Sequence, residues 1–400
     1  METVPSVESA RGGPALRQER GEVLAIPGSS PAQRQALQLA QERREVQARP
    51  CARGYTGLAV RQLTFVEAGR VEWQEVPDAV VPGPAGAVVR PLAVARCDLD
   101  LPMATAGLFP GPFPVGHETV AEVVAVGEQV RDRKPGDRVL VPFQVSCGAC
   151  AACQNRRFGG CATFRGRVGA AFGFGEAGGG FGGALADFLA VPAVDHLLVP
   201  APSDVSVTAL ATLPDNVADG YRAVGPPLRE RPGADVLIVG GMVKSVTLYA
   251  VAAAVATGAR RVHYVDSDPR SIAAAAALGA DVTEHRGNWP RRFDRALITV
   301  DGTGDPAGLA AVLRSTDDYG YCTSVAIYFD PLTPVPLREM YTRGVTFHVS
   351  RADSRRLLPE VIGLVAARRL DPLAIPTTVV PWGQAPTAWL EPATKLVLVR

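Results

Sequence analysis

Two patterns of apolar and polar residues follow one another along this chain. Between residue 62 and about residue 142, short apolar runs alternate with glycine and proline, for example at residues 119–126 and 138–141. Short runs punctuated in this way predict β-strands separated by turns. This part of the chain is therefore expected to form a β-rich domain.

From Asp235 onward the pattern changes to apolar strand, glycine-containing turn and alanine-rich helix. Strands are predicted at residues 236–239 and 261–265, with helices that begin after Lys244 and after Arg270. Such alternation is typical of a doubly wound parallel sheet covered by helices. The chain is therefore predicted to be of the α/β class, and its 400 residues are enough for two domains.

Residues 1–58 differ from both parts. Glycine, proline, serine, glutamate, arginine and glutamine dominate this segment, and large apolar residues are sparse. A segment of this composition cannot bury enough apolar surface to order itself. We therefore expect a disordered N-terminal extension.

The overall composition narrows the class of function. Apolar residues make up 47% of the chain and charged residues 20%, and the formal net charge is +1. This balance argues against nucleic acid or a membrane surface as a partner, because both usually require a basic face. No apolar run reaches the ~18 residues needed to cross a bilayer. Free thiols and the lack of an apolar segment near Met1 favour the cytoplasm.

A cluster of cysteines is the strongest chemical signal. Four of the seven cysteines follow C-x2-C-x2-C-x7-C spacing, as Cys147, Cys150, Cys153 and Cys161. Thiolates are soft ligands, and a structural zinc ion takes four ligands in a tetrahedron. We therefore predict a structural zinc site. A disulfide knot or a C-x-x-C redox pair remains as an alternative that fits the spacing less well.

A second signal indicates a dinucleotide. The apolar residues 235–239 run into Gly240 and Gly241, and a helix follows near Lys244. Glycines let the backbone approach a pyrophosphate, and a helix N-terminus supplies unpaired N–H groups. Asp266 ends the next strand, where a carboxylate can bind the adenosine ribose and repel a 2'-phosphate. This arrangement favours NAD over NADP.

The glycine turn is incomplete, however. Met242 and Thr247 stand where further glycines are expected, and Val243 lies between them. The glycine pair alone is therefore weak evidence for a cofactor site. Arg270 lies close enough to Asp266 in sequence to allow some tolerance of NADP.

An ordered set of motifs carries a resemblance to a known family. The motifs are Cys97-Asp98-Leu99-Asp100, Pro114-Val115-Gly116-His117-Glu118, Pro135-Gly136-Asp137-Arg138-Val139, Gly182-Gly183-Ala184, and Leu213-Pro214-Asp215 followed by Gly220-Tyr221. In this order they resemble the zinc-dependent medium-chain dehydrogenase/reductase family, the zinc-containing alcohol dehydrogenases. The resemblance covers about residues 60–400 and departs from the family signature after Gly-His-Glu at Ala121.

The resemblance implies a domain plan. Residues 59–216 would form a GroES-like catalytic domain, residues 217–349 an NAD-binding Rossmann domain, and residues 350–400 a return to the catalytic domain. Since the family-like sequence begins at Val60, we hypothesise that Val60 is a start residue encoded by GUG. A homodimer or homotetramer is expected from the resemblance alone.

The resemblance also implies a catalytic zinc ion. Its ligands would be Cys97, His117 and Asp215, with Glu118 as a fourth ligand that can replace water. Asp100 would orient the histidine, as carboxylates near metal ligands often do. Aspartate at position 215 is similar to that of the glutathione-independent formaldehyde dehydrogenases. Taken alone, Asp215 could equally cap a helix.

The implied function is hydride transfer between an alcohol or carbonyl substrate and NAD, with zinc as Lewis acid. Leu99 replaces the serine or threonine that normally passes the proton outward. The alternatives are therefore an aldehyde dismutase or another medium-chain reductase with an altered proton relay, and a non-catalytic protein that binds zinc and nucleotide. The glycine-rich residues 172–181 are predicted to be a mobile surface loop, so the sequence does not identify the substrate.

Overall fold

The structure, a computed structural model, describes residues 60–400, and the predicted N-terminal extension 1–58 lies outside them. The strands are β1 (Val60–Glu67), β2 (Arg70–Val76), β3 (Ala87–Arg96), β4 (Phe113–Pro114), β5 (Glu118–Val126), β6 (Arg138–Val141), β7 (Leu189–Val191), β8 (Val199–Pro200), β9 (Asp235–Val239), β10 (Arg261–Asp266), β11 (Asp281–Glu284), β12 (Ala296–Asp301), β13 (Thr316–Ser324), β14 (Thr346–Val349), β15 (Thr377–Pro381) and β16 (Lys395–Val399).

The α-helices are α2 (Asp100–Ala106), α3 (Ala151–Gln154), α4 (Val194–Leu197), α5 (Val207–Ala211), α6 (Ala218–Glu230), α7 (Ser245–Thr257), α8 (Pro269–Ala277), α9 (Pro306–Ser315), α10 (Leu337–Arg343), α11 (Ser354–Ala366) and α12 (Ala385–Ala388). Short turns of other helical types are η1 (Phe158–Gly160), η2 (Gly175–Gly178), the π-helical η3 (Leu213–Val217) and η4 (Trp382–Gln384).

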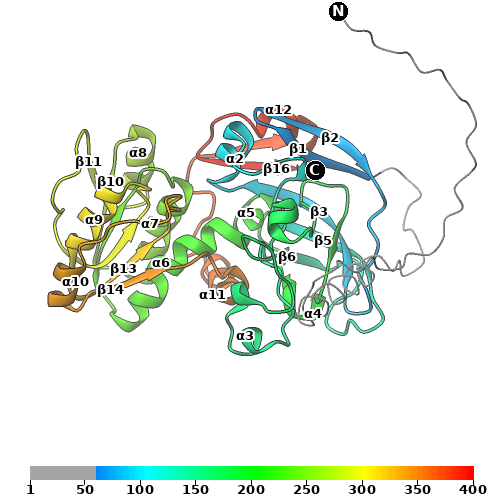
Figure 1. The fold of residues 1–400 in the computed structure, drawn as a ribbon. Coiled ribbons are helices and arrows are strands. Elements are labelled where there is room, and N and C mark those ends of the chain that lie inside the picture. The colour runs from blue at the N-terminus through cyan, green and yellow to red at the C-terminus, as the bar shows by residue number, and fades with distance from the viewer. Residues whose placement is uncertain (1–59) are drawn as a thin grey trace, which may run out of the picture. The chain divides into compact units, whose positions relative to one another are not determined.

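Strands β9 to β14 form a six-stranded sheet in the order β11-β10-β9-β12-β13-β14, and all of its strand pairs are parallel. Counted from β9, this is the 3-2-1-4-5-6 order of a dinucleotide-binding sheet. Figure 1 shows these strands in yellow to orange together with α7 to α10. The predicted α/β fold class is confirmed.

The apolar run of β9 follows from burial on both faces. Val236 and Ile238 belong to the core that includes α6 and α7, whereas Leu237 and Val239 belong to the core of α9 and α10. A strand covered by helices on both sides needs apolar residues at successive positions. For this reason the strand could be recognised in the sequence.

The β-rich part contains a second, mostly antiparallel sheet in the order β15-β16-β3-β5-β6-β8, with β7 also paired to β3. The C-terminal strand β16 pairs with β3, and Leu396 lies opposite Arg96. Figure 1 shows this red strand among the blue and cyan strands of the β-rich part. The start of β16 therefore lies beside the end of β3, which leads directly to Cys97.

The expected domain limits can be placed on these elements. The limit between residues 216 and 217 falls inside η3, and the limit after residue 349 coincides with the end of β14. Within residues 60–400, no helix combines the length and the hydropathy required to cross a membrane.

Candidate metal centres and cofactor site

The four cysteines converge in the loop that follows β6. Cys150 Sγ lies 3.5 Å from Cys153 Sγ and 3.9 Å from Cys161 Sγ, and Cys147 Sγ lies 4.0 Å from Cys153 Sγ. Four Zn–S bonds of about 2.3 Å in a tetrahedron place the sulfur atoms about 3.8 Å apart. The cluster therefore fits a structural zinc ion. The distances are too long for disulfides, whose S–S bonds are about 2.05 Å.

Backbone N–H groups surround these sulfur atoms. Ala149 and Cys150 donate to Cys147 Sγ, and Ala162 donates to Cys150 Sγ at 3.3 Å. The hydrogen bond from Ala162 contributes most to lowering the pKa of Cys150 to about 6. A thiol with a low pKa is readily available as the thiolate that binds metal. Burial raises the pKa of Cys153 to about 12, so metal must displace a proton from this thiol.

A second cluster is assembled from distant segments. Cys97 follows β3, His117 precedes β5, and Asp215 lies in the π-helical turn η3. Donor atoms of Cys97, Asp100 and His117 lie within 4.8 Å of one another, as do those of His117, Glu118 and Asp215. Each residue that we expected around the catalytic metal thus belongs to one of two groups that share His117.

The ring of His117 faces a carboxylate on each side. Its Nε2 lies 3.4 Å from Asp215 Oδ2, and its Nδ1 lies 3.7 Å from Asp100 Oδ1. Nδ1 and Asp100 Oδ1 are both buried without a hydrogen-bond partner. A ligating histidine commonly directs its other nitrogen to a carboxylate. Nε2 is therefore the nitrogen that can ligate a metal, and the donor set fits zinc.

Burial and charge act in opposite directions on this histidine. Burial by itself lowers the pKa of His117, but Asp100 and Asp215 outweigh it and raise the pKa to about 9. Burial also raises the pKa of the Cys97 thiol well above its usual value. Both groups must lose a proton before they can bind a metal, so metal and protons compete for this cluster.

Glu118 forms a buried ion pair that the sequence analysis missed. Lys395 Nζ lies 2.7 and 2.8 Å from the two carboxylate oxygens and donates to Arg96 O at 3.0 Å, and neither side chain is exposed. Burial raises the pKa of Glu118 to about 8 although Lys395 opposes the shift. The single lysine in the apolar strand β16 was the signal that could have revealed this pair.

Aromatic side chains cover the histidine. Phe174 stacks on His117 with ring centroids 5.1 Å apart, and Phe143 lies 5.5 Å from the same ring. The prediction of a surface loop at residues 172–181 is therefore wrong for the buried part of this segment, although Glu176 and Gly180 are exposed. Phe172 and the glycines at 175 and 178 are buried because this segment folds back over the site.

Leu99 contacts the candidate metal site through its backbone and not through its side chain. Its N–H donates to Cys97 Sγ at 3.3 Å, and its partly buried side chain packs against the apolar core of the β-rich part. No hydroxyl is therefore available at this position for a proton relay.

The glycine turn and Asp266 lie against each other as expected. A Cβ atom on Gly240 would collide with the Asp266 carboxylate and with the Tyr264 hydroxyl. Gly241 has a φ of +143°, which side-chain-bearing residues rarely adopt. Asp266 Oδ2 accepts a hydrogen bond of 2.6 Å from Tyr264. This end of the site fits the ribose side of a dinucleotide.

The remainder of the turn differs from the expected pattern. Counted from Gly240 by the G-x-G-x-x-G spacing, the later glycine positions fall on Met242 and Ser245, so the assignment to Thr247 was wrong. Ser245 is the first residue of α7, whereas Thr247 lies within the helix and its hydroxyl donates to Val243 O. Met242 is 43% exposed beside the turn. Arg270 is exposed near the start of α8.

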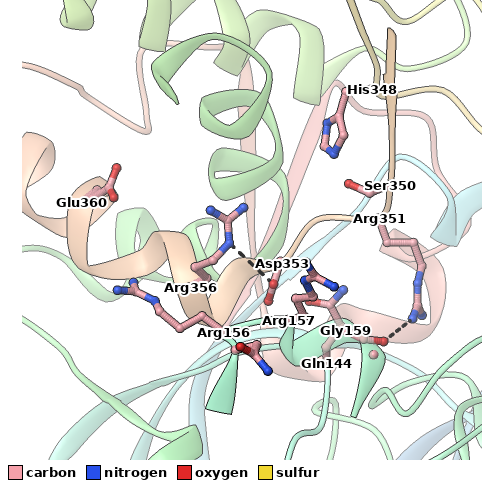
Figure 2. Close-up of a pocket in the computed structure, with 12 residues that line it drawn as sticks. Gln144, Arg156, Arg157, Gly159, His348, Ser350, Arg351, Asp353, Arg356 and Glu360 are labelled. Carbon is pink, nitrogen blue, oxygen red and sulfur yellow. Dashed lines mark hydrogen bonds and ion pairs between the residues drawn. The ribbon is translucent and has the colours of Figure 1, made fainter. Parts of the chain in front are cut away.

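A cavity of about 770 Å³ lies between the loop of the cysteine cluster and residues 348–360. Figure 2 shows its four arginines, with Arg356 directed toward Asp353 and Arg351 toward Gly159. None of the candidate metal ligands lines this cavity in the described part of the chain. Four guanidinium groups match a neutral alcohol poorly, so this cavity is not the expected substrate pocket.

The fold and the two ligand clusters point to one class of protein: a dehydrogenase with a GroES-like domain, a dinucleotide-binding sheet, a structural zinc site and a second cluster of candidate metal ligands. Comparison with known proteins agrees. The family model of the alcohol dehydrogenase GroES-like domain matches residues 83–203. A "Probable zinc-binding alcohol dehydrogenase" of Mycobacterium tuberculosis is 31% identical over 343 residues, which are 82% of this chain and 83% of that protein.

Two further relatives extend the comparison. The glutathione-independent formaldehyde dehydrogenase of Pseudomonas aeruginosa is 31% identical over 267 residues, 63% of this chain and 66% of that protein. The solved structure of an alcohol dehydrogenase from Thermus sp. ATN1 has a TM-score of 0.76 at 27% identity and covers 85% of this chain and 99% of its own. The chain belongs to the zinc-type medium-chain alcohol dehydrogenase family, and it is an alcohol dehydrogenase-like oxidoreductase.

Proposed function

We propose that this chain is an NAD-dependent and zinc-dependent oxidoreductase that acts on a small alcohol or carbonyl compound. The observation that carries the proposal is that His117 belongs to two groups of donor atoms, one with Cys97 and Asp100 and the other with Glu118 and the partly buried Asp215. Three protein ligands that leave a further position for substrate are typical of catalytic zinc sites.

The chain's own residues would hold and orient the reacting groups. Asp100, whose Oδ1 lies 3.7 Å from Nδ1, would orient the ring of His117 so that Nε2 faces zinc, and Lys395 balances the charge of Glu118. When bound, zinc would supply Lewis-acid polarisation of the substrate oxygen, and NAD would supply a hydride acceptor. Phe174 excludes water from one face of the histidine. Since Leu99 carries no hydroxyl, the proton would leave through water or through a group of the substrate.

Asp266 supports NAD as the preferred cofactor. Its carboxylate lies over Gly240 and is almost fully buried. A 2'-phosphate placed there would meet a negative charge in a region of low dielectric. The family resemblance further favours a homodimer or homotetramer, and the composition favours the cytoplasm.

One experiment tests the proposal. Purified protein would be analysed for zinc and then screened with a panel of alcohols and aldehydes, while the absorbance of reduced nicotinamide is followed with NAD and with NADP. We expect about two zinc ions per chain and a higher kcat/KM with NAD. Asp266→Ser should change the ratio of kcat/KM with NAD to kcat/KM with NADP by about tenfold in favour of NADP. Protein with full zinc but no turnover across the panel would favour the non-catalytic alternative.

A further inference from the structure

An aspartate occupies the start of the cofactor-binding helix. Asp98 follows Cys97 in the β-rich part, and its two carboxylate oxygens accept hydrogen bonds from the backbone N–H groups of Ser245 and Val246, each at 3.2 Å. These residues are the first two of the 13-residue helix α7. The first N–H groups of a helix have no partner inside the helix and form a natural anion site. Here a side chain of the same chain already fills it.

The neighbouring donors of the turn are engaged as well. The N–H of Val243 donates to Gly302 O at 3.1 Å, and the N–H of Met242 lies 3.4 Å from Thr303 O. Together with the two groups on Asp98, four backbone N–H groups between residues 242 and 246 therefore bond to other parts of the chain. A pyrophosphate could gain these donors only by displacing their present partners.

The charges around the turn also disfavour an added anion. Lys244 is the one cationic residue between positions 240 and 246, and its ammonium group pairs with Asp268. Asp98 and Asp266 bring two more carboxylates to the same turn. A dianionic pyrophosphate beside Asp98 would experience like-charge repulsion in a partly buried site.

The contact connects the helix to the metal cluster. Asn216 Nδ2 donates to Ser245 Oγ at 2.6 Å, and Asn216 follows Asp215. Two candidate metal ligands, Cys97 and Asp215, are thus each followed by a residue that contacts the first residue of α7. Displacement of Asp98 would therefore act on the backbone next to Cys97.

We propose that Asp98 is an internal competitor for the pyrophosphate of the dinucleotide, which must displace its carboxylate from the start of α7 before it can bind. This inference rests on the proposed use of NAD. When the binding-competent state is only partly populated, the apparent affinity falls by that fraction. Removal of the carboxylate should therefore tighten binding.

Calorimetric titration can test this with NADH, inorganic pyrophosphate and adenosine as separate probes. We expect Asp98→Ser to bind NADH and pyrophosphate at least about tenfold more tightly than the unmodified protein. Asp98→Asn is neutral but keeps an acceptor oxygen, so its affinity for both probes should lie between those of Asp98→Ser and the unmodified protein. Adenosine carries no phosphate, so its Kd should not change.

A matched control is Asp195→Ser. Asp195 also accepts two backbone hydrogen bonds, from Arg131 and Asp132 at 2.7 and 2.9 Å, but its partners belong to the β-rich part rather than to the glycine turn. This variant should bind all three probes like the unmodified protein. Melting temperature and zinc content would be measured for every variant, and Asp98→Asn carries the test if Asp98→Ser does not fold.

The outcomes separate the two proposals. An equal or weaker affinity for NADH in both Asp98 variants would overturn the role of Asp98, while measurable binding would leave the proposed use of NAD intact. Tighter binding without any alcohol-dependent reduction of NAD would support the role of Asp98 and contradict the proposed function. Failure of the unmodified protein and of every variant to bind NADH or pyrophosphate would contradict both.

Discussion

The two metal-ligand clusters of this chain are built in opposite ways. The cysteine cluster comes from one loop, and its sulfur atoms accept hydrogen bonds from backbone N–H groups of the same loop. The cluster around His117 comes from the ends of two strands and a π-helical turn, and it is supported by Asp100 and by Lys395 from the last strand. The cysteine cluster therefore holds one loop together, whereas the geometry of the His117 cluster depends on the packing of the whole β-rich part.

The difference teaches how each site resists the loss of its metal. Without zinc, the cysteine loop loses the cross-link between its four thiolates, and the buried apolar cluster within the loop is small. The residues around His117 are packed against strands and aromatic rings, which hold them in place even without a metal. Folding should therefore depend on the first cluster and chemistry on the second.

The largest expected effect follows from Cys153→Ser. Structural zinc contributes on the order of 10 kcal/mol in zinc-finger peptides at neutral pH, and three thiolates cannot close the tetrahedron. We expect insoluble or heat-labile protein with zinc falling from about two ions to about one. Cys322→Ser is the control, since Cys322 is buried but lies outside the cluster. A normal thermal melt of Cys153→Ser would contradict the structural role.

The reverse result is expected for His117→Asn. This change removes a ligand from the buried cluster and should reduce kcat/KM by at least about 1000-fold, because metal polarisation contributes several kcal/mol. Zinc should again fall from about two ions to about one, but the protein should stay folded. Metal analysis and circular dichroism check this directly. If His117→Asn retained both zinc ions, the assignment of Nε2 as a ligand would be wrong.

Lys395→Met examines the support of the second cluster. It leaves the Glu118 carboxylate buried without its partner, which typically costs about 3–5 kcal/mol. Denaturant unfolding should show this loss. The double variant Glu118→Gln with Lys395→Met removes both charges and should recover most of the stability. Equal free energies of unfolding for Lys395→Met and for the double variant would show that the two charges do not stabilise each other.

The smallest expected effect is a difference in pH response. The pKa of His117 is raised to about 9, whereas in the cysteine cluster the pKa of Cys150 is lowered to about 6 and burial raises that of Cys153 to about 12. Since only deprotonated ligands bind metal, acidification from pH 9 to pH 6 opposes zinc binding at both clusters. The His117 cluster should lose its zinc ion first, because three protein ligands hold the ion less tightly than the four thiolates of the cysteine cluster. Dialysis against a weak chelator across this range should remove about one zinc ion and leave the other. Simultaneous loss of both zinc ions would show that the two clusters do not differ in their response to pH.

Much of the molecule could be predicted from local patterns. The strand predicted at residues 138–141 is β6, and the strand at residues 236–239 lies within β9. Both have short-range signals, since a turn residue or a change of hydrophobic period marks each end. The four-cysteine zinc site was equally accessible, because all of its ligands lie within one loop.

Only the tertiary structure decided the surroundings of the second cluster. Lys395 reaches Glu118 because β16 pairs with β3, and Phe174 covers His117 because its loop folds inward. Asp98 meets α7 across almost 150 residues of chain. Sequence by itself determined the strands, the turns and the local zinc site, whereas contacts between distant segments follow from how sheets and helices pack, and that packing leaves no local pattern.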